Sequence, residues 1–112
     1  MDKINRIIKK VLSKTRSQNI KRQMEIWIDY LNENLIFPFE AIVLGDDITG
    51  EVKEGDIVVV NNSIYAYSEE GGIIVSSIHK GNYAYFELID LEVRDRKSHN
   101  YYLVEAYRKW FI

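Results

Sequence analysis

The stretch Leu31-Asn-Glu-Asn-Leu-Ile-Phe-Pro-Phe-Glu-Ala41 separates two halves of the chain that differ in residue pattern. Pro38 is the single proline of the sequence, and proline disfavours helical backbone for the residue before it. The preceding helix is therefore predicted to end near Asn34. From Phe37 to Ala41, every second residue suits the inward face of a half-buried strand. The stretch predicts a change from helix to sheet within one core.

A basic amphipathic segment lies upstream. Residues 2–13 place apolar side chains at helical spacing and cationic ones on the opposite side, which predicts a helix. The apolar set is Ile4, Ile7, Ile8, Val11 and Leu12, and the basic set is Lys3, Arg6, Lys9 and Lys10. Such a helix suits an anionic membrane surface, nucleic-acid phosphates, or packing of its apolar stripe on the domain. A second helix is predicted from about residue 20, capped by Ser17 or Asn19.

The downstream half reads mainly as short strands between turns. Strands are predicted at residues 39–44, 57–60, 64–67, 73–78 and 83–86, with a hairpin turn at 80–82, and residues 88–93 either continue the last strand or bend away. Residues 100–111 return to helical spacing after a cap at Ser98 or Asn100, and their clustered aromatic side chains are expected in the core. The predicted fold class is α+β, with N-terminal helices, a small antiparallel meander curled into an SH3-like barrel, and a C-terminal helix.

Length and composition favour a single soluble domain. The 112 residues are predicted to form one domain, with residues 1–16 as a basic helical arm and 17–112 as the core. No apolar run is long enough to span a membrane, and the N-terminus lacks a secretory signal pattern. Without cysteine there is no disulfide and no thiolate metal site. A cytoplasmic location is expected.

Charge is unevenly distributed along the chain. Residues 1–22 carry eight basic side chains against Asp2 alone, a net charge of +7, whereas residues 23–112 carry −9. Residues 25–70 hold eleven carboxylates against Lys53 alone. This asymmetry indicates that one segment can meet an anion and another a cation, or that the arm lies against its own acidic body.

The sequence contains no candidate catalytic site. The two histidines, His79 and His99, have no metal-ligand spacing, and there is no nucleophile motif and no phosphate-cradling glycine pattern. The protein is therefore not expected to be an enzyme.

Calcium is better matched to the residues, because it prefers six to eight hard oxygen ligands in flexible geometry. Glycines at 45, 50 and 55 mark turns in this part of the chain. The segment from residue 46 to 56 holds five carboxylates, namely Asp46, Asp47, Glu51, Glu54 and Asp56. It lacks the EF-hand pattern, so any site would be irregular, and the alternative is a solvated acidic loop.

Three stretches carry a resemblance to the CcbP-type calcium-binding protein family. They are Trp27-x-x-Tyr30-Leu31-x-Glu33-Asn34-Leu35-x-Phe37-Pro38-Phe39-Glu40-Ala41, then Leu88-x-Asp90-Leu91-Glu92, and finally Asn100-x-x-Leu103-Val104-x-x-Tyr107-x-x-Trp110-Phe111. The resemblance implies a small intracellular α+β protein that binds calcium through acidic surface residues without catalysis. Residues 2–13 lie outside these stretches.

The resulting hypothesis is non-catalytic binding and buffering of Ca²⁺ through the carboxylates of the acidic loop. Its candidate metal ligands are the five loop carboxylates together with Glu40, which lies just before the loop. The alternative is an interaction module that binds a protein, nucleic acid or lipid through the small barrel or the basic helix. The sequence gives no indication of the oligomeric state.

Overall fold

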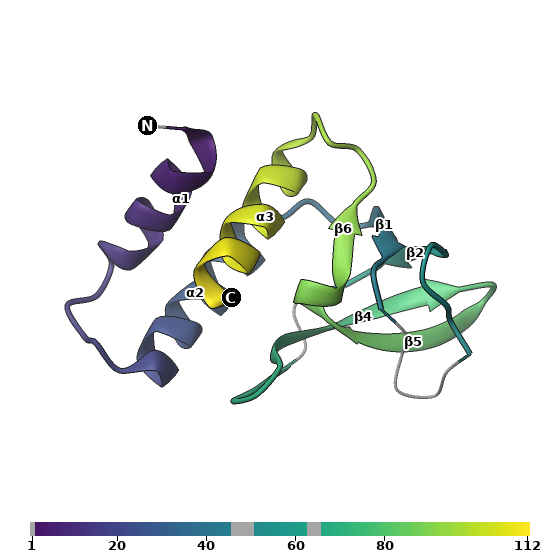
Figure 1. Ribbon diagram of the computed structural model, residues 1–112, viewed down its shortest axis with the longest axis horizontal. Coiled ribbons are helices and arrows are strands. Elements are labelled where there is room, and N and C mark those ends of the chain that lie inside the picture. The colour runs from purple at the N-terminus through teal and green to yellow at the C-terminus, as the bar shows by residue number, and fades with distance from the viewer. Residues whose placement is uncertain (1, 46–50, 63–65) are drawn as a thin grey trace.

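The computed structural model describes residues 2–45, 51–62 and 66–112, which form an α+β architecture. Helices lie at one end of an elongated molecule of 42 × 29 × 21 Å and the sheet lies at the other (Figure 1). The helices are α1 (Lys3–Leu12), α2 (Ile20–Asn34) and α3 (His99–Phe111). The strands are β1 (Phe39–Val43), β2 (Ile57–Val60), β3 (Ala66–Ser68), β4 (Gly72–His79), β5 (Asn82–Glu87) and β6 (Leu91–Val93), with a 3-10 turn η1 (Leu88–Asp90) before β6.

Each helix begins after a residue whose side chain accepts a backbone N–H of the first turn. Asp2 caps α1, Asn19 caps α2 and Ser98 caps α3. Such caps satisfy N–H groups that have no partner within the helix. For α2 and α3, the structure selects one of the two caps that the sequence allowed.

The turn from helix to strand is held by the start of α3. As predicted, α2 ends at Asn34 and β1 begins at Phe39. Between them, Ile36 donates its N–H to Asn100 Oδ1 at 3.0 Å, and Asn100 Nδ2 donates to the carbonyl of Ile36 at 2.8 Å. Asn100 is only 7% exposed, so these two hydrogen bonds satisfy a buried amide. They also fix the connection between α2 and β1, which we call the hinge.

The sheet has the order β3-β4-β2-β1-β6, and β5 pairs with β4. All of these pairings are antiparallel. The predicted hairpin between β4 and β5 is confirmed, with Lys80 and Gly81 at positive φ in its two-residue turn. Residues 64 and 65 of the predicted strand 64–67 lie outside the described residues, and β3 follows them.

The sheet is open, and the SH3-like barrel expected from the sequence is not shown. After β5, η1 interrupts the extended backbone and carries the chain across to β1, where Ile42 faces Glu92 of β6. Among the described strands, no pairing joins β5 to β6. The turn at Leu88–Asp90 therefore bends the chain away, the second of the two outcomes allowed for residues 88–93.

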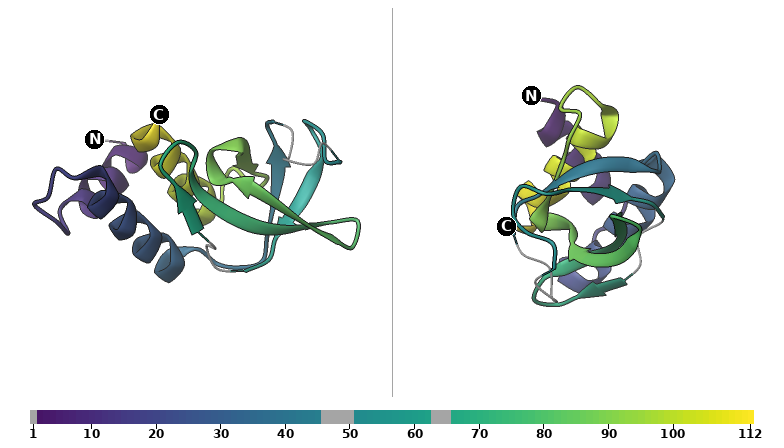
Figure 2. Two further views of the ribbon diagram at one scale, coloured as in Figure 1. Left: turned by 90° about the horizontal axis from the view of Figure 1, so that it is seen from below. Right: turned by 90° about the vertical axis from the view of Figure 1, so that its right-hand side faces the viewer.

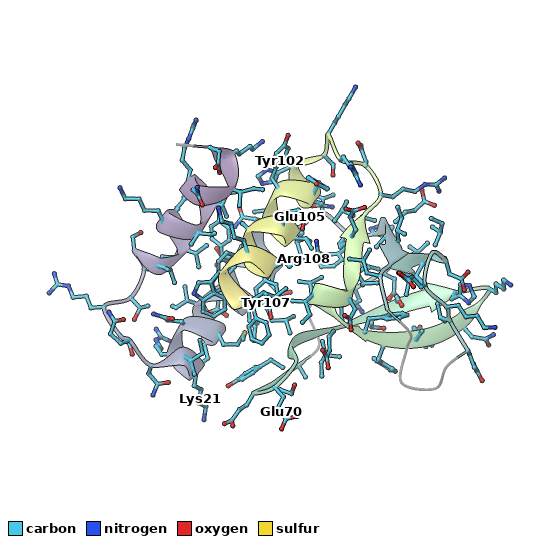
Figure 3. The ribbon with its side chains drawn as sticks, in the orientation of Figure 1. Lys21, Glu70, Tyr102, Glu105, Tyr107 and Arg108 are labelled. Atoms are coloured by element: carbon cyan, nitrogen blue, oxygen red, sulfur yellow. The ribbon has the colours of Figure 1, made fainter. Side chains whose placement is uncertain are left out.

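The core lies between the helices and the sheet. Trp27, Leu31 and Tyr107 are fully buried there, with Ile73 and Val75 from the inward face of β4. The ring centroids of Trp27 and Tyr107 lie 5.7 Å apart in an edge-to-face arrangement. Figure 3 shows Tyr107 among the side chains between the helices and the sheet. The aromatic residues of α3 are thus part of the core, as expected.

α1 is the outermost helix and lies beside α3 (Figures 1 and 2). Its apolar stripe is covered, with Ile7 8% and Val11 0% exposed. Lys109 Nζ also donates to Asn5 Oδ1 at 2.8 Å, which joins the end of α3 to the start of α1. The structure therefore shows the third of the alternatives for this helix, in which its apolar stripe packs on the rest of the molecule.

The ionisation of Tyr107 is expected to lower the stability of the fold at alkaline pH. Burial, as the largest cause, raises the pKa of Tyr107 to about 12, although its hydroxyl accepts the Ile73 N–H at 2.8 Å. Between pH 10 and 12 the Tyr107 hydroxyl is largely deprotonated in the unfolded chain but still protonated in the folded protein. The stabilisation is complete below pH 10 and is lost as pH rises towards 12, by up to about 2–3 kcal/mol.

The variant Tyr107→Phe is expected to be about 1–3 kcal/mol less stable at pH 8, because the buried Ile73 N–H loses its acceptor. Urea unfolding of both proteins at pH 8, 10 and 11 tests the titration, since the gap between them should shrink as pH rises. A gap that stays constant over this range would contradict the assignment to Tyr107.

Candidate metal site in the loop between β1 and β2

The acidic loop leaves β1 and returns as β2, and backbone bonds fix its base. Val43 donates its N–H to the carbonyl of Asp56 at 2.9 Å, and Gly55 donates to the carbonyl of Val43 at 2.7 Å. These bonds extend the pairing with β1 to Gly55 and Asp56, the two residues just before β2. The last residues of the loop are therefore held in register with the sheet.

Asp56 closes a tight turn at the end of the loop. Its Oδ2 accepts the Lys53 N–H at 3.0 Å, its own N–H donates to the Lys53 carbonyl at 3.0 Å, and Gly55 supplies the positive φ of 91°. His79 Nε2 lies 3.5 Å from the same Oδ2. One oxygen of this candidate ligand is thus engaged in local structure.

Val52 anchors the returning part of the loop. It is 3% exposed, whereas Glu51 and Glu54 are exposed. Beside it is a hollow of about 210 Å³, lined by Glu51, Val52, His79, Lys80, Asn82, Tyr83 and Ala84. Since Val52 is fixed in the core, Glu51 is held at the rim of this hollow.

Asp46 and Asp47 lie outside the described residues, so their positions relative to the other candidate ligands are not part of the structure. Within residues 2–45, 51–62 and 66–112, no group of three or more His, Asp or Glu side chains is arranged to hold a metal ion. The described part therefore contributes individual oxygens around the loop rather than a complete site.

Glu40 lies apart from the loop. It is exposed in β1, three residues before Val43, which corresponds to about 10 Å of strand. Arg94 Nη1 contacts its Oε2 at 3.1 Å, and the Arg94 N–H donates to its carbonyl at 3.0 Å. The structure therefore gives this candidate ligand a cationic neighbour and does not place it with the loop carboxylates.

Asp90 is an acidic residue at the loop that the candidate ligand set did not include. The Leu44 N–H donates to its carbonyl at 2.8 Å, and its Oδ1 lies 3.6 Å from where a Cβ on Gly45 would stand. Gly45 immediately precedes Asp46 and Asp47. The structure thus brings a carboxylate from η1 to the point where the acidic loop begins.

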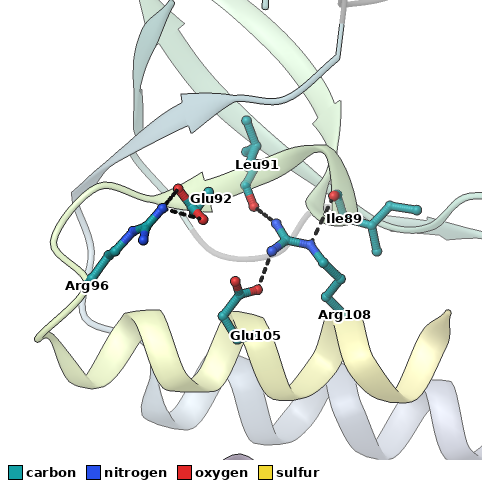
Figure 4. Close-up of polar contacts among 6 residues, drawn as sticks. All are labelled: Ile89, Leu91, Glu92, Arg96, Glu105 and Arg108. Atoms are coloured by element: carbon teal, nitrogen blue, oxygen red, sulfur yellow. Dashed lines mark hydrogen bonds and ion pairs between the residues drawn. The ribbon is translucent and has the colours of Figure 1, made fainter. Parts of the chain in front are cut away.

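Arg108 of α3 holds the backbone on both sides of Asp90 (Figure 4). Its Nε donates to the Ile89 carbonyl at 3.2 Å, its Nη2 donates to the Leu91 carbonyl, and its Nη1 pairs with Glu105. Because both neighbours of Asp90 are bound to a half-buried guanidinium, the backbone that carries the Asp90 carboxylate is held in place.

The sequence did contain a signal for Asp90, namely the stretch Leu88-x-Asp90-Leu91-Glu92 that supports the family resemblance. Its other carboxylate, Glu92, is paired with Arg96 at 3.2 Å (Figure 4). The two acidic residues of this stretch therefore differ in role, since Glu92 is used in an ion pair and Asp90 lies beside the loop.

In the described part of the chain, no helix is long and apolar enough to cross a membrane.

The family model for calcium binding by CcbP-type proteins matches residues 5–111. The match therefore includes most of α1, which the three quoted stretches left out. No curated protein sequence shows significant similarity to the chain.

The crystal structure of Anabaena CcbP superimposes on this fold with a TM-score of 0.74 at 16% sequence identity. The superposition covers 99% of this chain and 93% of that one. The structural likeness agrees with the α+β architecture, and the family model spans nearly the whole sequence. The chain therefore belongs to the CcbP family of calcium-binding proteins.

Proposed function

We propose that the protein binds and buffers Ca²⁺, without catalysis, through the carboxylates of residues 46–56. Membership of a family described by calcium binding supports the choice of ion. The loop supplies the hard oxygens that calcium prefers, and its glycines allow carbonyls to turn towards an ion. The proposed ligands are those of the sequence hypothesis, namely Glu40, Asp46, Asp47, Glu51, Glu54 and Asp56.

The observation that carries this proposal is the Asp90 carboxylate at Gly45, which we add to the proposed ligands. A carboxylate whose backbone is held by α3 costs less conformational entropy to organise around an ion than one on a free loop. Within this set Glu40 is the weakest contributor, because Arg94 pairs with its carboxylate and would have to release it before the carboxylate could meet the ion. We further propose that residues 1–112 act as one domain in the cytoplasm, which suits a chain without cysteine.

Calcium titration followed by amide NMR tests the proposal. Amides of residues 40–56 and of Asp90 are expected to shift at millimolar calcium and to shift much less with magnesium, which demands stricter octahedral geometry. The melting temperature should rise with calcium, because an ion that binds only the folded state stabilises it by mass action. If no amide in these segments shifts at millimolar calcium, the proposed function is wrong.

A pair of matched variants separates a loop site from general attraction to an acidic surface. The loop variant is Asp46→Asn/Glu51→Gln/Glu54→Gln, and the control is Asp29→Asn/Glu25→Gln/Glu33→Gln on α2. Both remove one aspartate and two glutamate charges, and both leave the Asp56 turn intact. The loop variant is expected to weaken calcium binding at least tenfold and the control less than about twofold. Equal weakening would point to diffuse surface charge.

The second candidate function is an interaction role for α1. The observation that favours it is that its apolar stripe is buried while Lys3, Lys9 and Lys10 remain exposed. Calcium binding at the opposite end of the molecule makes no use of these cations.

A further inference from the structure

The outer face of α1 is a basic surface with no role in the fold's core. Lys3, Arg6, Lys9 and Lys10 are all exposed on it, opposite the buried Ile7 and Val11. Figure 3 shows nitrogen-tipped side chains projecting from α1 away from the rest of the molecule. We refer to these four cationic side chains as the α1 basic face.

The spacing of these cations spreads them over two flanks of the helix. At about 100° per residue, Lys3 and Lys10 lie on one flank, Lys9 lies on the other, and Arg6 is between them. A flat anionic surface would be met chiefly by the middle of this arc. The two walls of a groove about 12 Å wide would instead be met by both flanks of a helix about 10–12 Å across.

Charge segregation orients the molecule towards an anion. Residues 1–22 carry +7 and the remainder −9, and α1 forms the end of the molecule away from the sheet (Figure 1). A polyanion would be attracted to α1 and repelled by the acidic body. A polyanion is therefore expected to approach the molecule at the end formed by α1.

Two contacts exclude other modes of anion binding. The apolar stripe of α1 is already buried against α3, so the helix cannot lay it into a bilayer without leaving the fold. The two aromatic rings near the cations already carry lysines, since Lys3 Nζ lies 4.4 Å from the centroid of Tyr102 and Lys14 Nζ lies 5.8 Å from that of Tyr30. A single-stranded base would have to displace a lysine in order to stack on either ring.

The amide on this helix that could read base edges is also engaged. Asn5 donates from Nδ2 to Asp2 Oδ2 at 3.0 Å, and its Oδ1 accepts from Lys109 at 2.8 Å. The α1 basic face then offers lysine and arginine cations for phosphate groups, and its amide is not available to read adenine. We propose that it docks on the phosphate backbone of double-stranded nucleic acid, without sequence preference.

The test is fluorescence anisotropy of a labelled duplex DNA of mixed sequence with the full chain, in a chelator so that the result is independent of calcium. The dissociation constant is expected to be roughly 1–100 µM at low salt, as for sequence-independent binding to phosphates. The logarithm of the affinity should fall against the logarithm of salt with a slope of about −3 to −4, as for three or four phosphate contacts. A single strand of the same length should bind more weakly.

Two lysine triples provide the matched comparison. Lys3→Gln/Lys9→Gln/Lys10→Gln alters the α1 basic face, and Lys53→Gln/Lys80→Gln/Lys97→Gln removes the same charge from exposed lysines elsewhere. The first triple is expected to lose at least tenfold in affinity and to flatten the salt slope, while the second stays within about threefold. Circular dichroism and thermal melting confirm that each triple is folded.

Three outcomes would overturn the proposal. They are no binding of the duplex by the unaltered protein at low salt, equal loss in the two triples, or binding to vesicles containing anionic phospholipid in the absence of duplex binding. None of them bears on calcium, which is excluded by the chelator, so this proposal and the calcium proposal fail separately.

Discussion

Gly72→Ala is expected to lower the free energy of unfolding by about 2–5 kcal/mol. Gly72 opens β4 with φ +77°, a conformation that strains any residue with a Cβ. A Cβ at this position would overlap Tyr107 Oη and come within 3.0 Å of the Phe111 ring. Tyr107 is fully buried and cannot swing away, so the bond from the Ile73 N–H to its hydroxyl would also be broken.

Gly71→Ala is the matched control for this effect. The nearest atoms to a Cβ there are those of the Glu87 carboxyl group, the end of a flexible side chain, and Gly71 does not have positive φ. The expected cost is below about 1 kcal/mol. Urea unfolding followed by circular dichroism measures both variants. Equal destabilisation of the two would show that the approach of Tyr107 to Gly72 is not a constraint.

Trp27→Ala is expected to cost about 3–5 kcal/mol, a large share of the stability of a domain of this size. The indole is 0% exposed and packs against the rings of Tyr107 and Trp110, with centroids 5.7 Å and 5.5 Å away. Its removal would leave a cavity where α2, α3 and the sheet meet. The measurement is again urea unfolding followed by circular dichroism.

Trp110→Ala removes the same side chain from a partly exposed position and is expected to cost about 1–2 kcal/mol. A third variant, Trp27→Phe, tests the indole N–H, which has no acceptor among the described residues. Trp27→Phe should lower the free energy of unfolding by less than the lost side-chain volume implies, because it also removes an unsatisfied buried donor. If Trp27→Ala cost no more than Trp110→Ala, Trp27 would not be the centre of the core.

The helices and the hinge could be predicted because their causes are local. Pro38 restricts its neighbour, side chains of the Asn19 and Ser98 type satisfy free N–H groups, and helical periodicity marks the buried stripes. These signals act within a few residues of the chain. The predicted end of α2 near Asn34 and the start of β1 at Phe39 follow from them.

The features that were missed depend on contacts between distant residues. Ile36 and Asn100 are 64 residues apart, so their bond leaves no local pattern. The open sheet follows from η1, whose turn is supported by Arg108 of α3. For the candidate site, carboxylate counting found the loop, but it could not show that Arg94 neutralises Glu40 or that Asp90 lies beside Gly45.

The packing of α1 on α3 has a consequence during protein synthesis. The bond from Lys109 to Asn5 joins residues 104 positions apart. At roughly 5–20 residues per second, on the order of 5–20 s pass between the appearance of the two partners on the ribosome. In that interval Ile7 and Val11 have no α3 to cover them. The nascent chain therefore exposes the basic amphipathic segment of α1, with its apolar stripe uncovered by α3, until α3 emerges.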